Sequence, residues 1–403
     1  MATTEHGLRL PGWLREEDCD VNELRDLVAT RTELADHPHA QQVVENVPVY
    51  SVPELRGALD RVAAVGGPAE RGLLTLQAEI ARALSQGPGV VVLSEAFDGA
   101  VVDRVSVAFE QMIADERERG GPAGDHFAAP GANDRVWNAL EKLAVADPEA
   151  FVDYYGNNAL ALVSRAWLGP AYQVTSQVNV VNPGGQAQSP HRDYHLGFLG
   201  TEAAAKYPAH VHQLSPLLTL QGAVAHCDMP VETGPTMYLP HSQKYLPGYI
   251  AWQLPEFVEL FEAEHVQLPL AKGDAVFFNP ALFHAAGSNR SAEVRRMANL
   301  LQVSSAFGRP MEAVDRRRTV SAVFPALLDR FRESADGTAV RNAVAAAADG
   351  YPFPTNLDLD PPVDGLAPPS QVDVVWQALR ERWSVERLDE ALAGYEARRR
   401  TAR

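Results

Sequence analysis

The stretch from about residue 173 to residue 307 constrains the fold of this 403-residue chain more than any other feature. It consists of short apolar and β-branched runs at roughly even spacing, with turn signals such as Pro183-Gly184 between them. The runs cover residues 174–181, 218–227, 236–239, 265–270, 275–278 and 296–307. Many short strands of this kind are typical of an antiparallel sandwich or jelly roll. We therefore expect a β core here, with no helices between its strands.

Helical periodicity precedes this β region. Apolar residues at helical spacing follow Pro53, precede Gly87 and recur from Val101 to Met112. Between the second and third of these helices, the run GVVVL at 89–93 is typical of a buried strand. Residues 120–134 have the glycine, proline and alanine content of an irregular loop that is long enough to cover a site.

Helical periodicity also follows the β region. It returns in residues 311–332 and 336–348, and a helical tail closes the chain after a proline-rich segment at 351–369. The chain is thus predicted to be mainly β in the middle and helical at both ends.

The charge balance limits the partners that the chain can bind. It has 52 acidic and 35 basic residues, for a net charge of −17. A surface of this sign repels nucleic-acid phosphates and anionic lipids. The tight basic clusters, at 316–318 and 398–400, have the character of helix faces or a tail. We therefore expect a small-molecule substrate, no nucleic acid and no membrane partner.

Cysteine content and hydropathy indicate the compartment. Cys19 and Cys227 are too few and too far apart in sequence for a disulfide framework or a thiolate zinc site. No apolar run approaches the roughly 18 residues of a membrane span, and the first residues lack a secretory signal pattern. These features predict a soluble protein in the reducing cytoplasm.

One motif has the spacing of a metal site. His191 and Asp193 stand at positions i and i+2, which point to the same face of a strand, and His284 could supply a distant third ligand. Two histidines and one carboxylate on one face of octahedral Fe(II) leave three positions open. Such a centre suits a bidentate 2-oxo acid together with O2, so we name these residues as candidate catalytic metal ligands.

A second motif has the same spacing. His226 and Asp228 also stand at i and i+2 in a strand-like context. Context favours the first motif, because Pro190 places His191 at a strand entrance near a rim, whereas His226 ends an apolar run. We interpret His226 as a hydrogen-bonded histidine at the edge of the core, and Asp228 as a turn residue.

Further polar residues could bind the 2-oxo acid. Arg295 follows His284 and enters the last strand, where its guanidinium could pair with the distal carboxylate of 2-oxoglutarate; Arg296 and Arg290 are alternatives. Gln177 and Asn179 alternate on the strand before the metal motif and could face the cavity as cofactor-binding groups. Cross-strand hydrogen bonding explains these two amides equally well.

Together, these segments resemble the phytanoyl-CoA dioxygenase family of Fe(II)/2-oxoglutarate oxygenases. The resemblance covers roughly residues 86–307. Its segments are GVVVL (89–93) with the following helix, SPHRDYHLG (189–197), AVAHCDMPVETGPTMYLPHSQK (223–244) and GDAVFFNPALFHAAGSNRSAEVRR (273–296). It implies Fe(II) held by His191, Asp193 and His284, 2-oxoglutarate bound by Arg295, and O2 as the oxidant.

The resemblance also implies an architecture. We expect an α+β chain whose mainly β core, a cupin-like double-stranded β-helix, has flanking helices. The core would span 86–307, with an N-terminal helical extension at 1–85 and a C-terminal helical extension at 308–403 that packs on the core. The extensions exceed what the minimal fold needs, so they could also mediate a homo-oligomer.

The implied activity is oxidation of a C–H bond with release of succinate and CO2. Asp193 favours hydroxylation or another oxidation over halogenation, since related halogenases have a small residue at this position. We expect a small organic or natural-product-like substrate. Two alternatives stay open: an acyl group on coenzyme A or a carrier, which the net charge disfavours, and a jelly roll that binds metal without catalysis.

Overall fold

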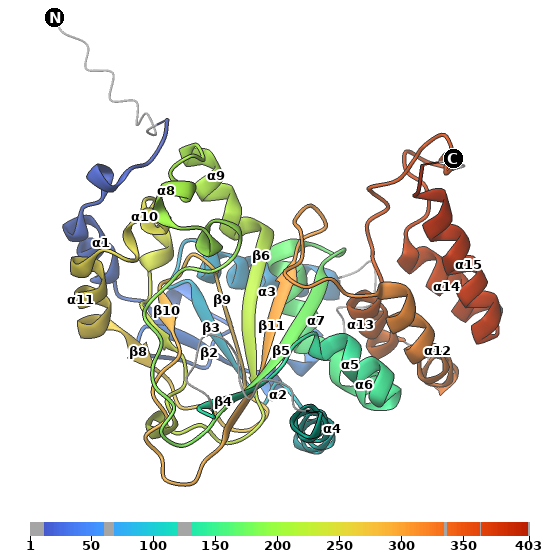
Figure 1. Cartoon of the computed structure of the whole chain (residues 1–403), viewed down its shortest axis with the longest axis horizontal. Helices are drawn as coiled ribbons and strands as arrows, with labels where there is room; N and C mark the ends of the chain where they lie inside the picture. Colours follow the sequence, from blue (N-terminus) through green and yellow to red (C-terminus); the bar gives the residue numbers. More distant parts are fainter. Residues whose placement is uncertain (1–11, 60–67, 120–130, 334–336, 363, 402–403) are drawn as a thin grey trace, which may run out of the picture.

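Two sheets form the centre of the structure (Figure 1), a computed structural model that describes residues 12–59, 68–119, 131–333, 337–362 and 364–401. The large sheet contains, in spatial order, β1 (Gln42–Val44), β2 (Val47–Ser51), β3 (Val90–Ser94), β9 (Ala275–Phe278), β6 (Thr219–Ala225), β11 (Arg296–Ser304), β5 (Gln173–Val181) and β4 (Asn133–Val136). The small sheet contains β10 (His284–Ala285), β7 (Met237–Tyr238) and β8 (Val266–Gln267).

An apolar layer between the two sheets forms one core. Tyr238 and Leu268 pack there against Val92, Val276 and Phe278 of the large sheet. A second sheet packed over part of the first is the arrangement that the alternating strands predict. The predicted fold class, a jelly-roll β core with flanking helices, is confirmed.

Helices cover the other face of the large sheet and form the main core with it. They are α3 (Pro68–Ser85), α4 (Gly99–Glu118), α5 (Ala139–Ala146), α6 (Pro148–Tyr155), α7 (Asn158–Leu168), α12 (Arg316–Glu333), α13 (Thr338–Ala347), α14 (Gln371–Glu381) and α15 (Val385–Arg398). Figure 1 shows α12 to α15 gathered on one side of the molecule, where α12 contacts α5, α6 and α13. Strand alternation decides the faces: Met297 and Val303 of β11 join this helical core, and Ala298 lies on the opposite face.

Helices also lie between the strands, so our expectation of an uninterrupted β region is wrong. They are α8 (Thr201–Ala204), α9 (Ala209–Leu214), α10 (Gly248–Ala251) and α11 (Pro255–Glu264). Only α11 is long enough to show helical periodicity: Pro255 occupies its first turn, and Phe257, Leu260 and Phe261 form its buried face. Helices of four to six residues have no such signal.

The N-terminal region contributes strands as well as the helices α1 (Val21–Val28) and α2 (Val52–Leu59). Strand β2 runs parallel to β3, with Val49 opposite Val92, and β1 pairs with β2. We expected only helices there. Because β2 has five residues and α2 begins directly after it, the change of period from 2 to 3.6 is not visible in the sequence.

Several connections contain a single 3-10 turn, whereas residues 348–370, between α13 and α14, contain no helix or strand among their described residues. Single 3-10 turns occur at η1 (Glu16–Asp18), η2 (Leu34–Asp36), η3 (His195–Phe198), η4 (Ser215–Leu218), η5 (Val231–Thr233) and η6 (Ser242–Lys244). Most of the loop that we expected at 120–134 lies outside the described residues, and its end belongs to β4. Among the described residues, no helix is long and apolar enough to cross a membrane.

Candidate metal centre

Backbone pairing brings the two distant halves of the metal motif together. His191 and His284 form an antiparallel bridge, in which each backbone N–H donates to the other's carbonyl at 2.9 and 3.1 Å. The backbone N–H of Asp193 donates to the carbonyl of Pro280 at 3.0 Å. Residues paired in this way project their side chains to the same side. The three predicted ligands therefore converge although they come from separate segments.

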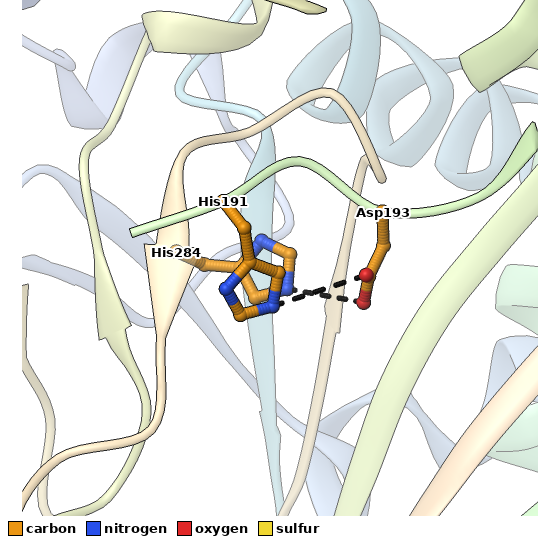
Figure 2. Close-up of side chains that lie close together, drawn as sticks. All are labelled: His191, Asp193 and His284. Carbon is orange, nitrogen blue, oxygen red and sulfur yellow. Dashed lines mark ion pairs between the residues drawn. The ribbon is translucent and has the colours of Figure 1, made fainter. Parts of the chain in front are cut away.

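The three side chains meet at their polar ends (Figure 2). Nε2 of His191 lies 3.8 Å from Oδ1 of Asp193, and Nε2 of His284 lies 3.4 Å from Oδ2. One potential ligand atom from each residue lies within 4.8 Å of the other two. This is the geometry in which one ion could contact all three, as in a facial triad of two histidines and one carboxylate.

Local hydrogen bonds orient both imidazoles. Nδ1 of His191 lies 2.9 Å from the carbonyl oxygen of Ser189, and Nδ1 of His284 lies 2.9 Å from that of Leu282. Since a carbonyl can only accept, each Nδ1 carries a proton, and in the neutral form of each ring the lone pair is on Nε2. Both Nε2 atoms face the carboxylate of Asp193.

The electrostatics match the protonation states that a metal requires. Burial lowers the pKa of His191, and neighbouring His284 lowers it further, so His191 is neutral. Although burial alone would raise the pKa of Asp193, both histidines and Gln221 together lower it below its usual range. Neutral imidazoles and an ionised carboxylate are the forms that bind a divalent cation.

Gln221 is a neighbour of the centre that the sequence analysis missed. It lies on β6, and its Nε2 donates to Oδ2 of Asp193. A polar side chain inside the apolar run LTLQGAVA was the available signal, since a glutamine within a buried strand needs a partner.

The ligands open onto a cavity of about 570 Å³ on the small-sheet side of the large sheet. Alternate residues of β11 form much of its wall, namely Arg296, Ala298, Leu300 and Gln302. Arg296 and Gln302 stand six positions apart on β11, so their Cα atoms are about 20 Å apart along the strand. Gln302 lies opposite Gln221, which contacts Asp193.

Arg295 and Arg290 lie away from this wall. Nη1 of Arg295 donates to Glu110 at 2.9 Å, Nη2 lies 3.4 Å from Asp134, and the side chain is 42% exposed. Arg290 is exposed. Arg296, by contrast, is 6% exposed and donates Nη1 to the carbonyls of Thr233 and Gly287. Of the three arginines that the sequence left open, Arg296 is the one in the cavity wall.

The two predicted strand amides face the cavity side, as their alternation suggested. Asn179 belongs to the cavity wall and accepts a hydrogen bond from Asn133. Gln177 is fully buried, accepts from Nη2 of Arg135 at 2.5 Å and donates to Glu312 at 3.3 Å. Protein groups thus satisfy much of their hydrogen bonding, and their role toward a cofactor stays a prediction.

His226 of the second motif is a buried, hydrogen-bonded histidine, as we expected, whereas Asp228 is exposed. Nδ1 of His226 bonds with Ser106 at 2.8 Å, and Nε2 bonds with Tyr154 at 2.9 Å. Burial lowers the pKa of His226 to about 3. Asp228 accepts a hydrogen bond at 2.9 Å from the backbone N–H of Lys272, which lies in a turn. Both nitrogens of His226 are therefore engaged within the protein.

The profile of the family described as phytanoyl-CoA dioxygenase (PhyH) matches residues 85–297, just over half of the chain. No curated protein matches the chain significantly.

Solved structures with similarity include the non-heme alpha ketoglutarate dependent carbocyclase SnoK from nogalamycin biosynthesis, with 19% identity, a TM-score of 0.41, and coverage of 56% of this chain and 83% of SnoK. AviO1 from Streptomyces viridochromogenes Tue57 has 19% identity, a TM-score of 0.40, and coverage of 55% and 92%. The epimerase SnoN from nogalamycin biosynthesis has 17% identity, a TM-score of 0.37, and coverage of 59% and 82%.

Proposed function

The chain belongs to the phytanoyl-CoA dioxygenase family of Fe(II)- and 2-oxoglutarate-dependent oxygenases, and on that premise we propose that His191, Asp193 and His284 hold its iron. The observation that carries this proposal is the convergence of one ligand atom from each residue within 4.8 Å. The donor set also suits the metal, because two neutral imidazoles and a carboxylate are typical ligands of Fe(II) in oxygenases. All three side chains line the cavity, so an ion that they held would face its open space.

Bound Fe(II), 2-oxoglutarate and O2 supply the oxidising power that breaks a C–H bond, with succinate and CO2 as co-products. The chain's own residues hold and orient the reactants. The carbonyls of Ser189 and Leu282 fix the two imidazoles, and Gln221 fixes the carboxylate of Asp193. Such contacts to metal ligands set both affinity and geometry. The carboxylate at Asp193 supports hydroxylation rather than halogenation.

Arg296 takes the place of Arg295 as our proposed ligand for the distal carboxylate of 2-oxoglutarate. Its guanidinium lies in the cavity wall together with the side chains of Thr236 and Tyr238, whereas Arg295 already pairs with Glu110 and Asp134. Burial lowers the pKa of Arg296 to about 10, which still leaves it charged at neutral pH. A buried guanidinium next to hydroxyl groups is suited to a carboxylate.

The substrate that we propose is a small organic molecule rather than an acyl-coenzyme A. Coenzyme A carries several phosphates, and the basic cluster 316–318 would be the site to receive them. Arg316 donates to the carbonyls of Ala346 and Val174, Arg317 pairs with Asp389, and Arg318 pairs with Glu141. All three guanidiniums have partners inside the chain, so nothing favours a phosphate there. A complete ligand set in a family of enzymes also leaves no support for a non-catalytic module.

Turnover of 2-oxoglutarate tests the proposed centre. We expect Asp193→Ala to abolish Fe(II)-dependent succinate formation and to lower the affinity for Fe(II), measured by anaerobic titration. Asp228→Ala is the matched control, since it removes the exposed carboxylate of the second motif, and it should retain most of the activity and of the Fe(II) affinity. If the two variants behaved alike, or if Asp228→Ala alone lost activity, the assignment would be wrong.

A further inference from the structure

The cavity wall contains two guanidiniums, and the proposed function uses only one of them. Apart from the three proposed metal ligands, Arg135 and Arg296 are the charged residues that line the cavity in the described part of the chain. Arg296 is our proposed ligand for the distal carboxylate of 2-oxoglutarate. Arg135 stands on β4 and is half-buried. A few charged or polar groups in a largely apolar pocket usually fix the orientation of a ligand, so Arg135 calls for a ligand of its own.

Protein groups hold the guanidinium of Arg135 in place. Its Nη2 donates to Oε1 of Gln177 at 2.5 Å, and the guanidinium lies over the ring of Trp137 at 4.8 Å. The amide of Gln177 is itself oriented, because its Nε2 donates to Glu312 at 3.3 Å. Glu312 also accepts from the backbone N–H of Asn138 at 2.7 Å. A cation held in this way is preorganised, since little side-chain entropy is left to lose when a ligand binds.

The acid at the far end of this chain of contacts stands behind the cavity wall. Glu312 does not line the cavity, and the amide of Gln177 lies between its carboxylate and Arg135. Burial raises the pKa of Glu312, whereas its hydrogen bonds and the charge of Arg135 lower it. Met311, the residue before Glu312, lines the cavity, and its sulfur lies 3.9 Å from Nε2 of Gln177. A ligand of Arg135 therefore meets a guanidinium and a thioether on this side of the cavity.

The two guanidiniums are held by different parts of the chain. Arg296 stands on β11 and donates to the carbonyls of Thr233 and Gly287. Arg135 stands on β4, the edge strand of the large sheet, and β5 separates the two strands. The proposed function assigns one carboxylate of 2-oxoglutarate to the metal and the other to Arg296. Arg135 is therefore left for a different anionic group.

We propose that Arg135 binds a carboxylate of the substrate, so that the substrate is a small carboxylic acid. A guanidinium and a carboxylate form two parallel hydrogen bonds, and five N–H donors allow Arg135 to contact Gln177 at the same time. Gln177 and Glu312 then act as positioning residues for Arg135. A single carboxylate also suits a chain with a net charge of −17 better than the several phosphates of coenzyme A. This inference rests on the proposed function, since it names the substrate class of the same site.

Matched pairs of probes test the inference. The chain is loaded with Zn(II) and saturating 2-oxoglutarate, which form a non-reacting diamagnetic complex, and saturation-transfer NMR at pH 7.5 measures binding of cyclohexanecarboxylate and benzoate. Cyclohexanecarboxamide and benzamide keep each ring but carry no charge. We expect transfer to at least one carboxylate to exceed transfer to its amide about threefold or more. Equal transfer within both pairs, or no transfer to any probe, would overturn the inference.

Variants show whether Arg135 is responsible for the preference for a carboxylate. Arg135→Gln should reduce transfer to the carboxylate to the level of its amide. Arg135→Lys keeps the charge without the planar fork, so it should lower the preference without abolishing it, and it decides the matter if Arg135→Gln does not fold. Arg387→Gln is the matched control and should keep the preference, because Arg387 also lies over a tryptophan, Trp383 at 4.1 Å, but is exposed on α15. An undiminished preference in the folded Arg135 variants, or an equal loss in Arg387→Gln, would overturn the inference.

The positioning role of Glu312 has its own pair of variants. Glu312→Leu removes the acceptor for Gln177 and should lower the preference for the carboxylate probe. Glu312→Gln keeps an oxygen that can accept from Gln177 and should restore the preference. The same preference in both variants as in the wild type would show that Arg135 needs no such support, and the positioning role would be wrong.

Affinity for 2-oxoglutarate separates the role of Arg135 from that of Arg296. Titration of the Zn(II)-loaded chain should give the same affinity for 2-oxoglutarate in Arg135→Gln as in the wild type. A fall of about tenfold or more, together with an intact preference for the carboxylate probe, would make Arg135 a ligand of 2-oxoglutarate and overturn the inference.

This inference and the proposed function can fail separately, because saturation transfer reports binding and not oxidation. A chain that prefers the carboxylate probes through Arg135 but never forms succinate would refute the proposed function only. A chain that forms succinate with Fe(II) but does not distinguish carboxylates from amides would refute the inference only.

Discussion

Arg295 and Arg296 are neighbours in sequence but lie on opposite faces of the sheet. Arg295 pairs with Glu110 and Asp134 outside the cavity, and Arg296 lies in the cavity wall with 6% of its surface exposed. Because strand residues alternate between faces, a shift of one position decides which of the two guanidiniums faces the cavity.

The first prediction concerns this pair. Arg296→Lys keeps a positive charge but loses the two-pronged contact to a carboxylate, so the 2-oxoglutarate concentration for half-maximal succinate formation should rise on the order of tenfold to a hundredfold. Arg295→Lys, the matched control, should change it little. Steady-state assays at varied 2-oxoglutarate decide between them; a shift only in Arg295→Lys would restore Arg295 as the ligand.

Gln221 should affect metal binding through its hydrogen bond to Asp193. Gln221→Met removes the donor that holds Asp193, and losing a hydrogen bond to a metal ligand typically weakens affinity about 10- to 100-fold. Anaerobic titration with Fe(II) measures this. Gln302→Met does not touch Asp193 and should bind Fe(II) as tightly as the wild type. Equal affinities in all three proteins would rule out the orienting role of Gln221.

The buried Arg192, which stands between His191 and Asp193, should be sensitive to Gly248. Its Nη2 donates to the carbonyls of Ser242 and Tyr245 at 2.7 and 2.8 Å. A Cβ at position 248 would overlap this guanidinium. Gly248→Ala should therefore destabilise the protein by about 1–3 kcal/mol.

Chemical unfolding of Gly248→Ala measures the loss. Gly200→Ala is its control, because a Cβ there meets nothing within 4 Å. The Gly248→Ala variant should also bind Fe(II) more weakly than the wild type, since Arg192 links two of the three proposed ligands. A stability equal to that of Gly200→Ala would show that Arg192 can move aside freely.

Acid should destabilise the fold through His226, whose pKa burial lowers to about 3 from about 6.5 in the unfolded chain. Between these values the unfolded state takes up a proton that the folded state refuses. The neutral ring therefore costs no stability above pH 6.5. As the pH falls from 6.5 toward 3, the folded state loses stability relative to the unfolded state, and this loss is about 2 kcal/mol at pH 5.

His226→Gln tests this, because an amide can still bond with Ser106 and Tyr154 but does not titrate. The free energy of unfolding is compared at pH 7.5 and pH 5 in metal-free protein. The variant should lose about 2 kcal/mol less than the wild type over this range. The same loss in both proteins would mean that His226 is not the responsible group.

The sequence was informative where strand alternation or the spacing of a few histidines and acids predicted the structure. The alternating runs predicted β5, β6, β9 and β11, and the spacing of His191, Asp193 and His284 predicted side chains that the structure brings together. His226 was correctly separated from them because its strand context predicted burial.

The sequence was less informative where three-dimensional pairing decides. Which of Arg295 and Arg296 faces the cavity depends on the register of β11 against β5 and β6, and neighbouring positions look alike in sequence. The role of Gln221 depends on its hydrogen bond to Asp193, which lies in a different segment of the sequence. The division into three segments, a homo-oligomer through the terminal helices and a cytoplasmic location stay predictions.

The parallel pairing of β2 with β3 has a consequence for shortening the chain. The segment that matches the family begins at residue 85, after β2, so a fragment cut there would lose both outer strands on that side of the large sheet. Its new margin would be β3, a run of three valines whose free N–H and C=O groups would face solvent. Open margins of this kind recruit strands from other molecules and promote aggregation. The region before the family match thus also shields the oxygenase core from self-association.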